Sequence, residues 1–184
     1  MNSRMKKLIK PIILVAVFIF AVCWLIKKPL NFDDYCSYIG YAISGVGIVF
    51  VLYEKYLWKV IPWNRPPVLK KHYDGMITYL SKKDVLRKKI DISVCQSLFS
   101  VRIITKTDIN SSNSMVGQIV EENGESILYY SYTTNPSAVT QKTNPVQYGT
   151  CRITLNKECK KMQGKYWTTS QTIGDIEWIA SKEG

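Results

Sequence analysis

Residues 164–178 read GKYWTTSQTIGDIEW and contain two short alternating segments joined by a turn-like centre. In the first segment, Tyr166 and Thr168 fall on one face of an extended chain, because successive side chains of a strand point to opposite sides. In the second, Ile176 and Trp178 share a face opposite two acidic residues. This pattern predicts an amphipathic β hairpin close to the C-terminus.

Similar short runs recur throughout the residues that precede this hairpin. Counting the hairpin, the predicted strands are 75–80, 89–96, 98–107, 115–122, 126–133, 147–156, 162–169 and 174–181. Asn123-Gly124 favours a tight turn, and the Ser/Asn tract 110–114 and residues 134–145 are predicted as longer turns. Eight short antiparallel strands favour a compact closed β-barrel, which has room for one small ligand at its mouth, over a small sandwich.

The N-terminal part of the chain has a different character. Residues 11–26 and 35–53 contain no charged side chain, and each stretch predicts a helix that spans a membrane, the first with help from Leu8 and Ile9. The short loop between them makes a helical hairpin. A secretory signal is the alternative, but no A-x-A cleavage site follows the first apolar stretch.

Basic residues predict the orientation of this hairpin. Residues 1–65 hold nine basic and three acidic side chains, a balance of +6, and residues 66–184 hold sixteen and eleven, a balance of +5. The basic residues of the first part gather before the first helix and after the second, so we expect both termini on the cytosolic side of the membrane. The smaller excess in the second part suits an anionic ligand or lipid surface.

The expected organisation is therefore a membrane-anchored all-β protein. It comprises two N-terminal transmembrane helices in residues 1–60, a Pro/Trp linker in 61–70, and a cytosolic eight-stranded antiparallel β-barrel in 71–184. On the second helix, Gly40, Ser44 and Gly47 are small residues at helical spacing. Such residues allow helices to approach closely in lipid, either within one hairpin or between copies.

The sequence contains no recognisable catalytic or metal-binding motif. Its five cysteines include no CxxC pair, and His72 is the only histidine. No catalytic motif such as HExxH, GxSxG or a Walker loop occurs. We therefore expect a binding protein rather than an enzyme, with no metal and no cofactor.

Several residues are candidates for a ligand site. Tyr130 and Tyr132 share one face of their strand and could stack on a nucleobase. Gln96 continues an apolar face, where its amide needs partners, which could be backbone groups. Ser112 and Ser114, in SSNS, could donate hydrogen bonds to phosphate. Candidates for pairing with phosphate are Arg102, Arg152, Lys106 and Lys165.

Taken in order, these segments resemble a known family. They are the two-helix N-terminus, PWNRPP at 62–67, DGMITYLS at 74–81, the Gln96 region, SSNS at 111–114, Tyr130 and Tyr132 with Asn135-Pro136, QYGTCRITL at 147–155 and GKYWTTSQTIG at 164–174. The chain resembles the SMODS-associating two-transmembrane, β-strand-rich effectors. These are the CD-NTase-associated barrel receptors of bacterial CBASS anti-phage defence.

The resemblance implies that the barrel binds a cyclic dinucleotide made by a partner nucleotidyltransferase. Binding would lead to homo-oligomers that disrupt the inner membrane and kill the infected cell, with no role for a DNA or RNA polymer. Tyr166 and Thr168 join the expected ligand contacts. The sequence departs from the family at Ser170, where a basic residue is expected, and at Gln147, where a histidine is expected, so Arg102 or Arg152 would have to supply positive charge.

Two other functions remain open at this point. A membrane-tethered, lipocalin-like barrel would carry an apolar ligand in a dry interior. A structural membrane subunit would bind no ligand at all.

Overall fold

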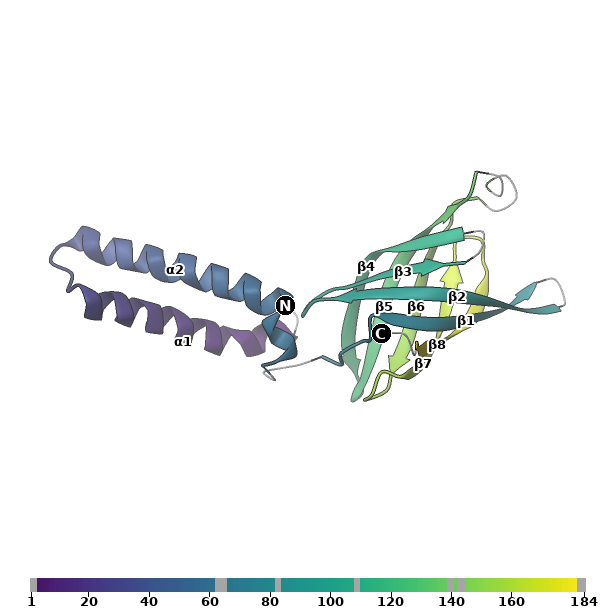
Figure 1. The fold of residues 1–184 in the computed structure, drawn as a ribbon, viewed down its shortest axis with the longest axis horizontal. Helices are drawn as coiled ribbons and strands as arrows, with labels where there is room; N and C mark the ends of the chain where they lie inside the picture. The colour runs from purple at the N-terminus through teal and green to yellow at the C-terminus, as the bar shows by residue number, and fades with distance from the viewer. Residues whose placement is uncertain are drawn as a thin grey trace. The chain divides into compact units, whose positions relative to one another are not determined.

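The structure, a computed structural model, describes residues 3–61, 66–81, 84–107, 110–138, 141 and 145–181. The chain divides into two compact units, Met1–Arg65 and Pro66–Gly184 (Figure 1). Part of the predicted linker, residues 62–65, lies outside the described residues, as does most of 139–144 in the predicted turn 134–145.

The first unit is a helical hairpin. Helix α1 spans Ser3–Ile26 and α2 spans Phe32–Lys55, followed by the 3₁₀ turn η1 at Leu57–Lys59. Leu8–Ile26 and Phe32–Lys55 are each long and apolar enough to cross a membrane, which confirms the two predicted helices. Many of their apolar side chains are exposed, as expected for a surface that lipid covers.

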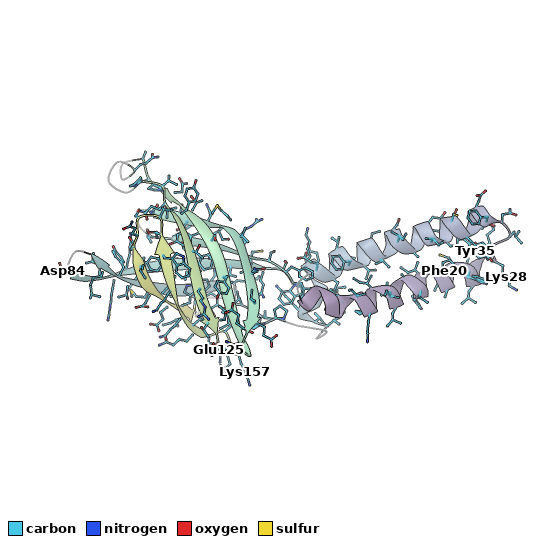
Figure 2. All side chains as sticks on the ribbon, turned by 180° about the vertical axis from the view of Figure 1, so that it is seen from behind. Phe20, Lys28, Tyr35, Asp84, Glu125 and Lys157 are labelled. Atoms are coloured by element: carbon cyan, nitrogen blue, oxygen red, sulfur yellow. The ribbon has the colours of Figure 1, made fainter. Side chains whose placement is uncertain are left out.

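Aromatic side chains and one carboxylate stabilise the turn end of this hairpin. The Asp34 carboxylate accepts hydrogen bonds from the N–H groups of Leu30, at 2.9 Å, and Asn31, at 3.3 Å. The ring centroid of Trp24 lies 6.0 Å from that of Phe20 and 5.7 Å from that of Tyr35. Figure 2 shows Phe20 and Tyr35 near this end.

The second unit is a closed up-and-down barrel in which each strand pairs antiparallel with the next and β8 pairs with β1. The strands are β1 His72–Ser81, β2 Asp84–Gln96, β3 Val101–Lys106, β4 Asn110–Glu122, β5 Glu125–Pro136, β6 Tyr148–Leu155, β7 Lys161–Thr168 and β8 Ile173–Ala180. The predicted barrel and its eight strands are confirmed. In Figure 2, Asp84 lies at one end of the barrel, and Glu125 and Lys157 lie at the other.

The core fills the end of the barrel where β1 begins. The Trp178 ring is fully buried, with its centroid 5.4 Å from that of Tyr73 and 6.1 Å from that of Tyr130. Strand alternation produces this core, because β6 buries Cys151, Ile153 and the other inward residues while the residues between them face outward. The other end of the barrel has a different lining.

Two turn predictions had different outcomes. Asn123 and Gly124 have φ angles of 51° and 82° and join the paired residues Glu122 and Glu125, so the predicted tight turn is confirmed. The prediction that residues 110–114 form a turn is wrong, because β4 begins at Asn110 and pairs with both β3 and β5. Residues 98–100, predicted to begin a strand, precede β3 instead.

Candidate ligand-binding site

A half-open cavity of about 280 Å³ occupies the end of the barrel opposite the packed core. Its walls come from all eight strands and the segments that continue them, at the end where β1 finishes and β2 begins. Its buried members are Tyr130, Cys151, Tyr166, Ile90 and Ile176, and Tyr79, Lys88 and Thr134 are half-buried. The interior of the barrel is thus apolar at one end and polar at the other.

Four tyrosines form much of the wall: Tyr79, Tyr130, Tyr132 and Tyr166. The centroids of the Tyr130 and Tyr132 rings are 5.9 Å apart, with the ring planes at 44°. Burial raises the pKa of Tyr166 to about 12, and it raises the pKa values of Tyr130 and Tyr132 further above the ordinary value. These hydroxyl groups are therefore neutral at physiological pH and can donate hydrogen bonds to a ligand.

Two glycines make room for two of these rings. A Cβ atom on Gly174 would lie 2.6 Å from Cε1 of Tyr166, and one on Gly149 would lie 2.5 Å from the hydroxyl oxygen of Tyr132. Each ring therefore lies against a stretch of backbone that carries no side chain. This close approach keeps the rings at the wall and the centre of the cavity open.

The rest of the lining is rich in hydroxyl and amide groups. The side-chain oxygens of Thr105 and Ser112 are 2.9 Å apart and share a hydrogen bond. Asn110 Oδ1 and Thr168 Oγ1 are buried without a hydrogen-bond partner among the described atoms. Buried polar atoms normally have a partner, so these two are available to a ligand that enters the cavity.

Lys88 is the only charged residue among the described residues that line the cavity. Its side chain is half-buried, and no ion pair within the described residues involves it. The sequence prediction missed it, although a signal was present. Lys88 precedes the buried Ile90 and Ile92 by two and four residues, so it lies on the inward face of β2.

Five of the predicted ligand contacts meet in the cavity: Ser112, Tyr130, Tyr132, Tyr166 and Thr168. Gln147 lines it too, whereas Ser170 is exposed after the end of β7. Tyr79 and Asn110 were missed by the sequence prediction. Tyr79 was within reach, because it follows Ile77 at the two-residue spacing of a strand, but Asn110 fell in the segment expected to be a turn.

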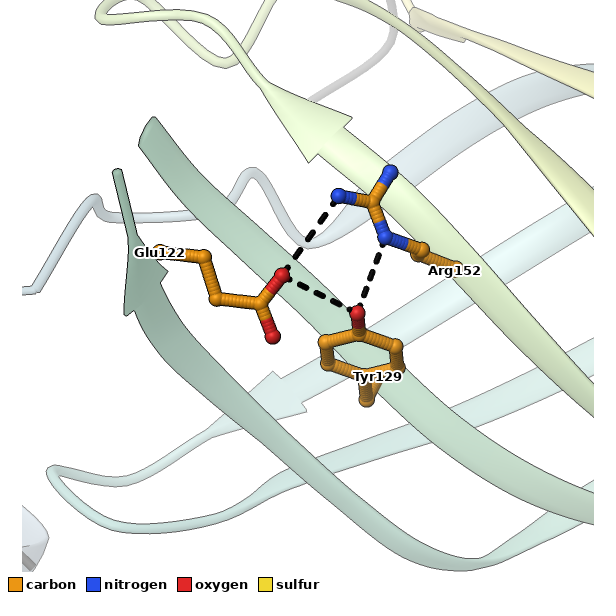
Figure 3. Close-up of polar contacts among 3 residues, drawn as sticks. All are labelled: Glu122, Tyr129 and Arg152. Atoms are coloured by element: carbon orange, nitrogen blue, oxygen red, sulfur yellow. Dashed lines mark hydrogen bonds and ion pairs between the residues drawn. The ribbon is translucent and has the colours of Figure 1, made fainter. Parts of the chain in front are cut away.

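The structure does not bring Arg102 or Arg152 into the cavity. Both alternate with buried residues and lie on the outer wall, as do the exposed Lys106 and Lys165. Arg152 Nε donates to the Tyr129 hydroxyl at 2.8 Å, and its Nη2 lies 3.5 Å from Glu122 Oε2 (Figure 3). The Tyr129 hydroxyl also donates to that carboxylate, at 3.2 Å, so the three residues form one outer network.

Gln96 and Ser114 have structural partners away from the cavity. Gln96 Oε1 accepts from the N–H of Leu69 at 2.8 Å, and its Nε2 donates to the carbonyl of Pro67 at 2.9 Å. These two hydrogen bonds join the first residues of the second unit to the end of β2, at the end of the barrel opposite the cavity. Ser114 Oγ accepts from the N–H of Ile103 at 2.8 Å, beside a register shift in β4.

A closed eight-stranded barrel with a half-open, hydroxyl-rich cavity has the architecture of small β-barrels that can hold one small ligand at the mouth. The family model described as "Cap15, cyclic dinucleotide receptor domain" matches residues 65–179, and the chain belongs to this family. CD-NTase-associated protein 15 of Staphylococcus schleiferi is 29% identical over 182 residues, which cover 96% of this chain and 97% of that protein. The resemblance to the CBASS barrel effectors is confirmed.

Proposed function

We propose that the cavity of the barrel binds a cyclic dinucleotide made by a partner nucleotidyltransferase. The observation that carries this proposal is a tyrosine-walled cavity in a receptor-domain family. Among its described residues the cavity has one cation, Lys88, and two buried polar atoms without a partner. Tyrosine rings offer surfaces for stacking on bases, and the ammonium group of Lys88 offers a charge to a phosphate. The hydroxyl-rich lining suits a nucleotide better than the apolar cargo of a lipocalin-like barrel.

In this proposal the two helices anchor the chain in the bacterial inner membrane, with both termini in the cytosol. Ligand binding favours homo-oligomers, since a ligand shifts an equilibrium only when it binds one state better than the other. The assembled helices then disrupt the bilayer, and the infected cell dies.

The face that α2 offers to other copies carries Gly40, Ser44 and Gly47. A Cβ added at Gly40 or Gly47 would meet no described atom within 4 Å, and Ser44 is exposed. Gly45, by contrast, packs against α1, because a Cβ there would lie 2.8 Å from Ile19 Cδ1. Of the two roles considered for the small residues, the orientation of these three favours packing between copies.

The experiment that tests ligand binding uses the full chain in lipid nanodiscs and a panel of cyclic dinucleotides. A ligand at about 100 times its Kd should stabilise the folded protein by roughly 2.7 kcal/mol, which raises the melting temperature by several degrees. A panel without any shift would contradict the proposal and favour the apolar-ligand or structural readings.

Two neighbouring lysines provide a matched pair of variants. Lys88→Met removes the charge at the cavity, and we expect it to weaken binding by about 1.5–3 kcal/mol, or roughly 10- to 150-fold. Lys89→Met removes the same charge from the outward face of β2 and should leave the affinity nearly unchanged. Equal effects of the two variants would show that the cavity does not hold the phosphate.

A further inference from the structure

The cavity is small for the ligand proposed above. A cyclic dinucleotide carries two bases, two riboses and two phosphates, whereas the cavity measures about 280 Å³. A cavity of about 150 Å³ holds one benzene-sized ring. Sites that enclose most of a drug-sized molecule span roughly 300–1,000 Å³. The space therefore suffices for one base with part of its ribose, and the second nucleotide has no room beside it.

The charge of the lining also indicates that only one of the two nucleotides lies inside the cavity. Each of the two phosphates carries a negative charge, and Lys88 is the only charged residue among the described residues of the lining. An unpaired charge removed from water is strongly disfavoured. One phosphate can therefore meet Lys88, and the other stays at the mouth in contact with water.

Two buried polar atoms of the cavity can form hydrogen bonds that depend on which base enters it. Asn110 Oδ1 is an acceptor and requires a donor from the ligand, while the Thr168 hydroxyl can either donate or accept. A base with the wrong pattern of donors and acceptors leaves these buried atoms unpaired, which lowers its affinity. A base that remains at the mouth is read by neither atom.

We propose that the barrel recognises the two nucleotides unequally. One base is enclosed and selected by Asn110 and Thr168, with its phosphate at Lys88, while the second base lies at the mouth and is selected weakly. This inference rests on the proposed function, because it divides the same ligand between the inside and the outside of the cavity.

The test measures Kd for the full chain in nanodiscs, with cyclic dinucleotides of adenine, guanine, cytosine and uracil in one linkage. Starting from the tightest ligand, each base is replaced in turn. If that ligand is a hybrid, we expect replacement of one base to weaken binding at least tenfold and replacement of the other no more than about twofold. If it carries two identical bases, the single replacement should cost about twofold and the double replacement at least tenfold.

The outcomes separate this inference from the proposed function. If replacement of either base raises Kd by a similar factor, or if neither replacement changes Kd, unequal recognition is overturned. The protein would still be a cyclic dinucleotide receptor. If no member of the panel binds, both proposals fail. Thr168→Val provides a second readout, because it should reduce the discrimination at the selective position at least fivefold. Thr154→Val, on the outward face of β6, should leave that discrimination intact.

Discussion

At the scale of single residues, side-chain direction decides which predicted contacts belong to the cavity. Tyr130 and Tyr132 line the cavity because the two-residue period of a strand puts them on one face with the buried Leu128. The same period places Arg102 and Arg152 on the outside, next to inward-facing residues. An expectation based on charge alone selected the arginines, whereas the period of β2 places Lys88 inside.

Thr168 illustrates a conflict between stability and ligand binding. Its buried hydroxyl has no described partner, and an unsatisfied buried group costs about 1–3 kcal/mol. Thr168→Val keeps the shape of the side chain and removes that group. We therefore expect it to raise the free energy of unfolding by up to this amount while it weakens ligand binding. Thermal melting with and without the cyclic dinucleotide measures both effects.

The control for this comparison is Thr154→Val, which should change neither quantity by much. A clear loss of stability in Thr168→Val would show that its hydroxyl has a structural partner. Such a result would remove one of the two atoms assigned to base selection.

At the scale of elements, the sequence predicted strands well where one face is apolar and less well near the cavity. The inward positions of β4 close to the mouth are Asn110 and Ser112, because they line a polar space rather than a packed core. An alternating pattern of apolar and polar residues is therefore missing, and polar residues in sequence are typical of a turn. The cavity end of the barrel is thus the part whose secondary structure was hardest to predict.

Ser114 should be important for stability and unimportant for affinity. Its hydroxyl accepts from Ile103 N–H beside the register shift in β4, so Ser114→Ala leaves that donor without this partner. We expect a loss of about 1–3 kcal/mol in the free energy of unfolding. The Kd for the ligand should stay within about twofold. Chemical denaturation and a binding titration measure the two quantities.

Ser111→Ala, on the outer face of the same strand, is the matched control and should leave stability nearly unchanged. If Ser114→Ala weakens ligand binding more than it lowers stability, the contact expected from the sequence at this position is real.

The exposed face of α2 leads to a prediction about killing. Gly40→Leu combined with Ser44→Leu adds bulk where the structure has open space. It should prevent close helix approach between copies. We expect this variant to bind ligand normally and to lose toxicity when expressed with the nucleotidyltransferase. Growth of the host and membrane permeability to a dye are the measurements.

Ala21→Leu adds similar bulk to an exposed position on α1 and should remain toxic. Full toxicity of the α2 variant would refute the role given to Gly40 and Ser44.

At the scale of the whole molecule, burial of ionisable groups determines how stability depends on pH. Burial raises the pKa of Tyr73 and of Tyr166 to about 12, from an ordinary value of 10.0, and that of Cys151 to about 12, from 9.0. The unfolded chain therefore loses these protons at a lower pH than the folded barrel does. Stability from these groups is complete below about pH 9 and is lost as the pH rises toward 12.

Thermal melting between pH 7 and pH 12, combined with the absorbance of tyrosinate, tests this expectation. The melting temperature should stay level up to about pH 9 and then fall, and the absorbance of the buried tyrosines should rise with unfolding. Ionisation of all tyrosines near pH 10 in a folded barrel would contradict the burial described here.

Closure of the barrel also bears on whether an assembled state could be undone. Each of the eight strands pairs with a neighbour on both sides over part or all of its length. The described barrel therefore has no strand with one side wholly unpaired, the kind of edge on which a sheet shared between copies grows. In the clusters of the proposed function, contacts between barrels would then be made mainly by side chains, which separate without breaking the backbone hydrogen bonds of the barrel. If the proposed clusters form, their barrels would be able to separate without unfolding once the ligand is lost, and assembly would be reversible at that stage.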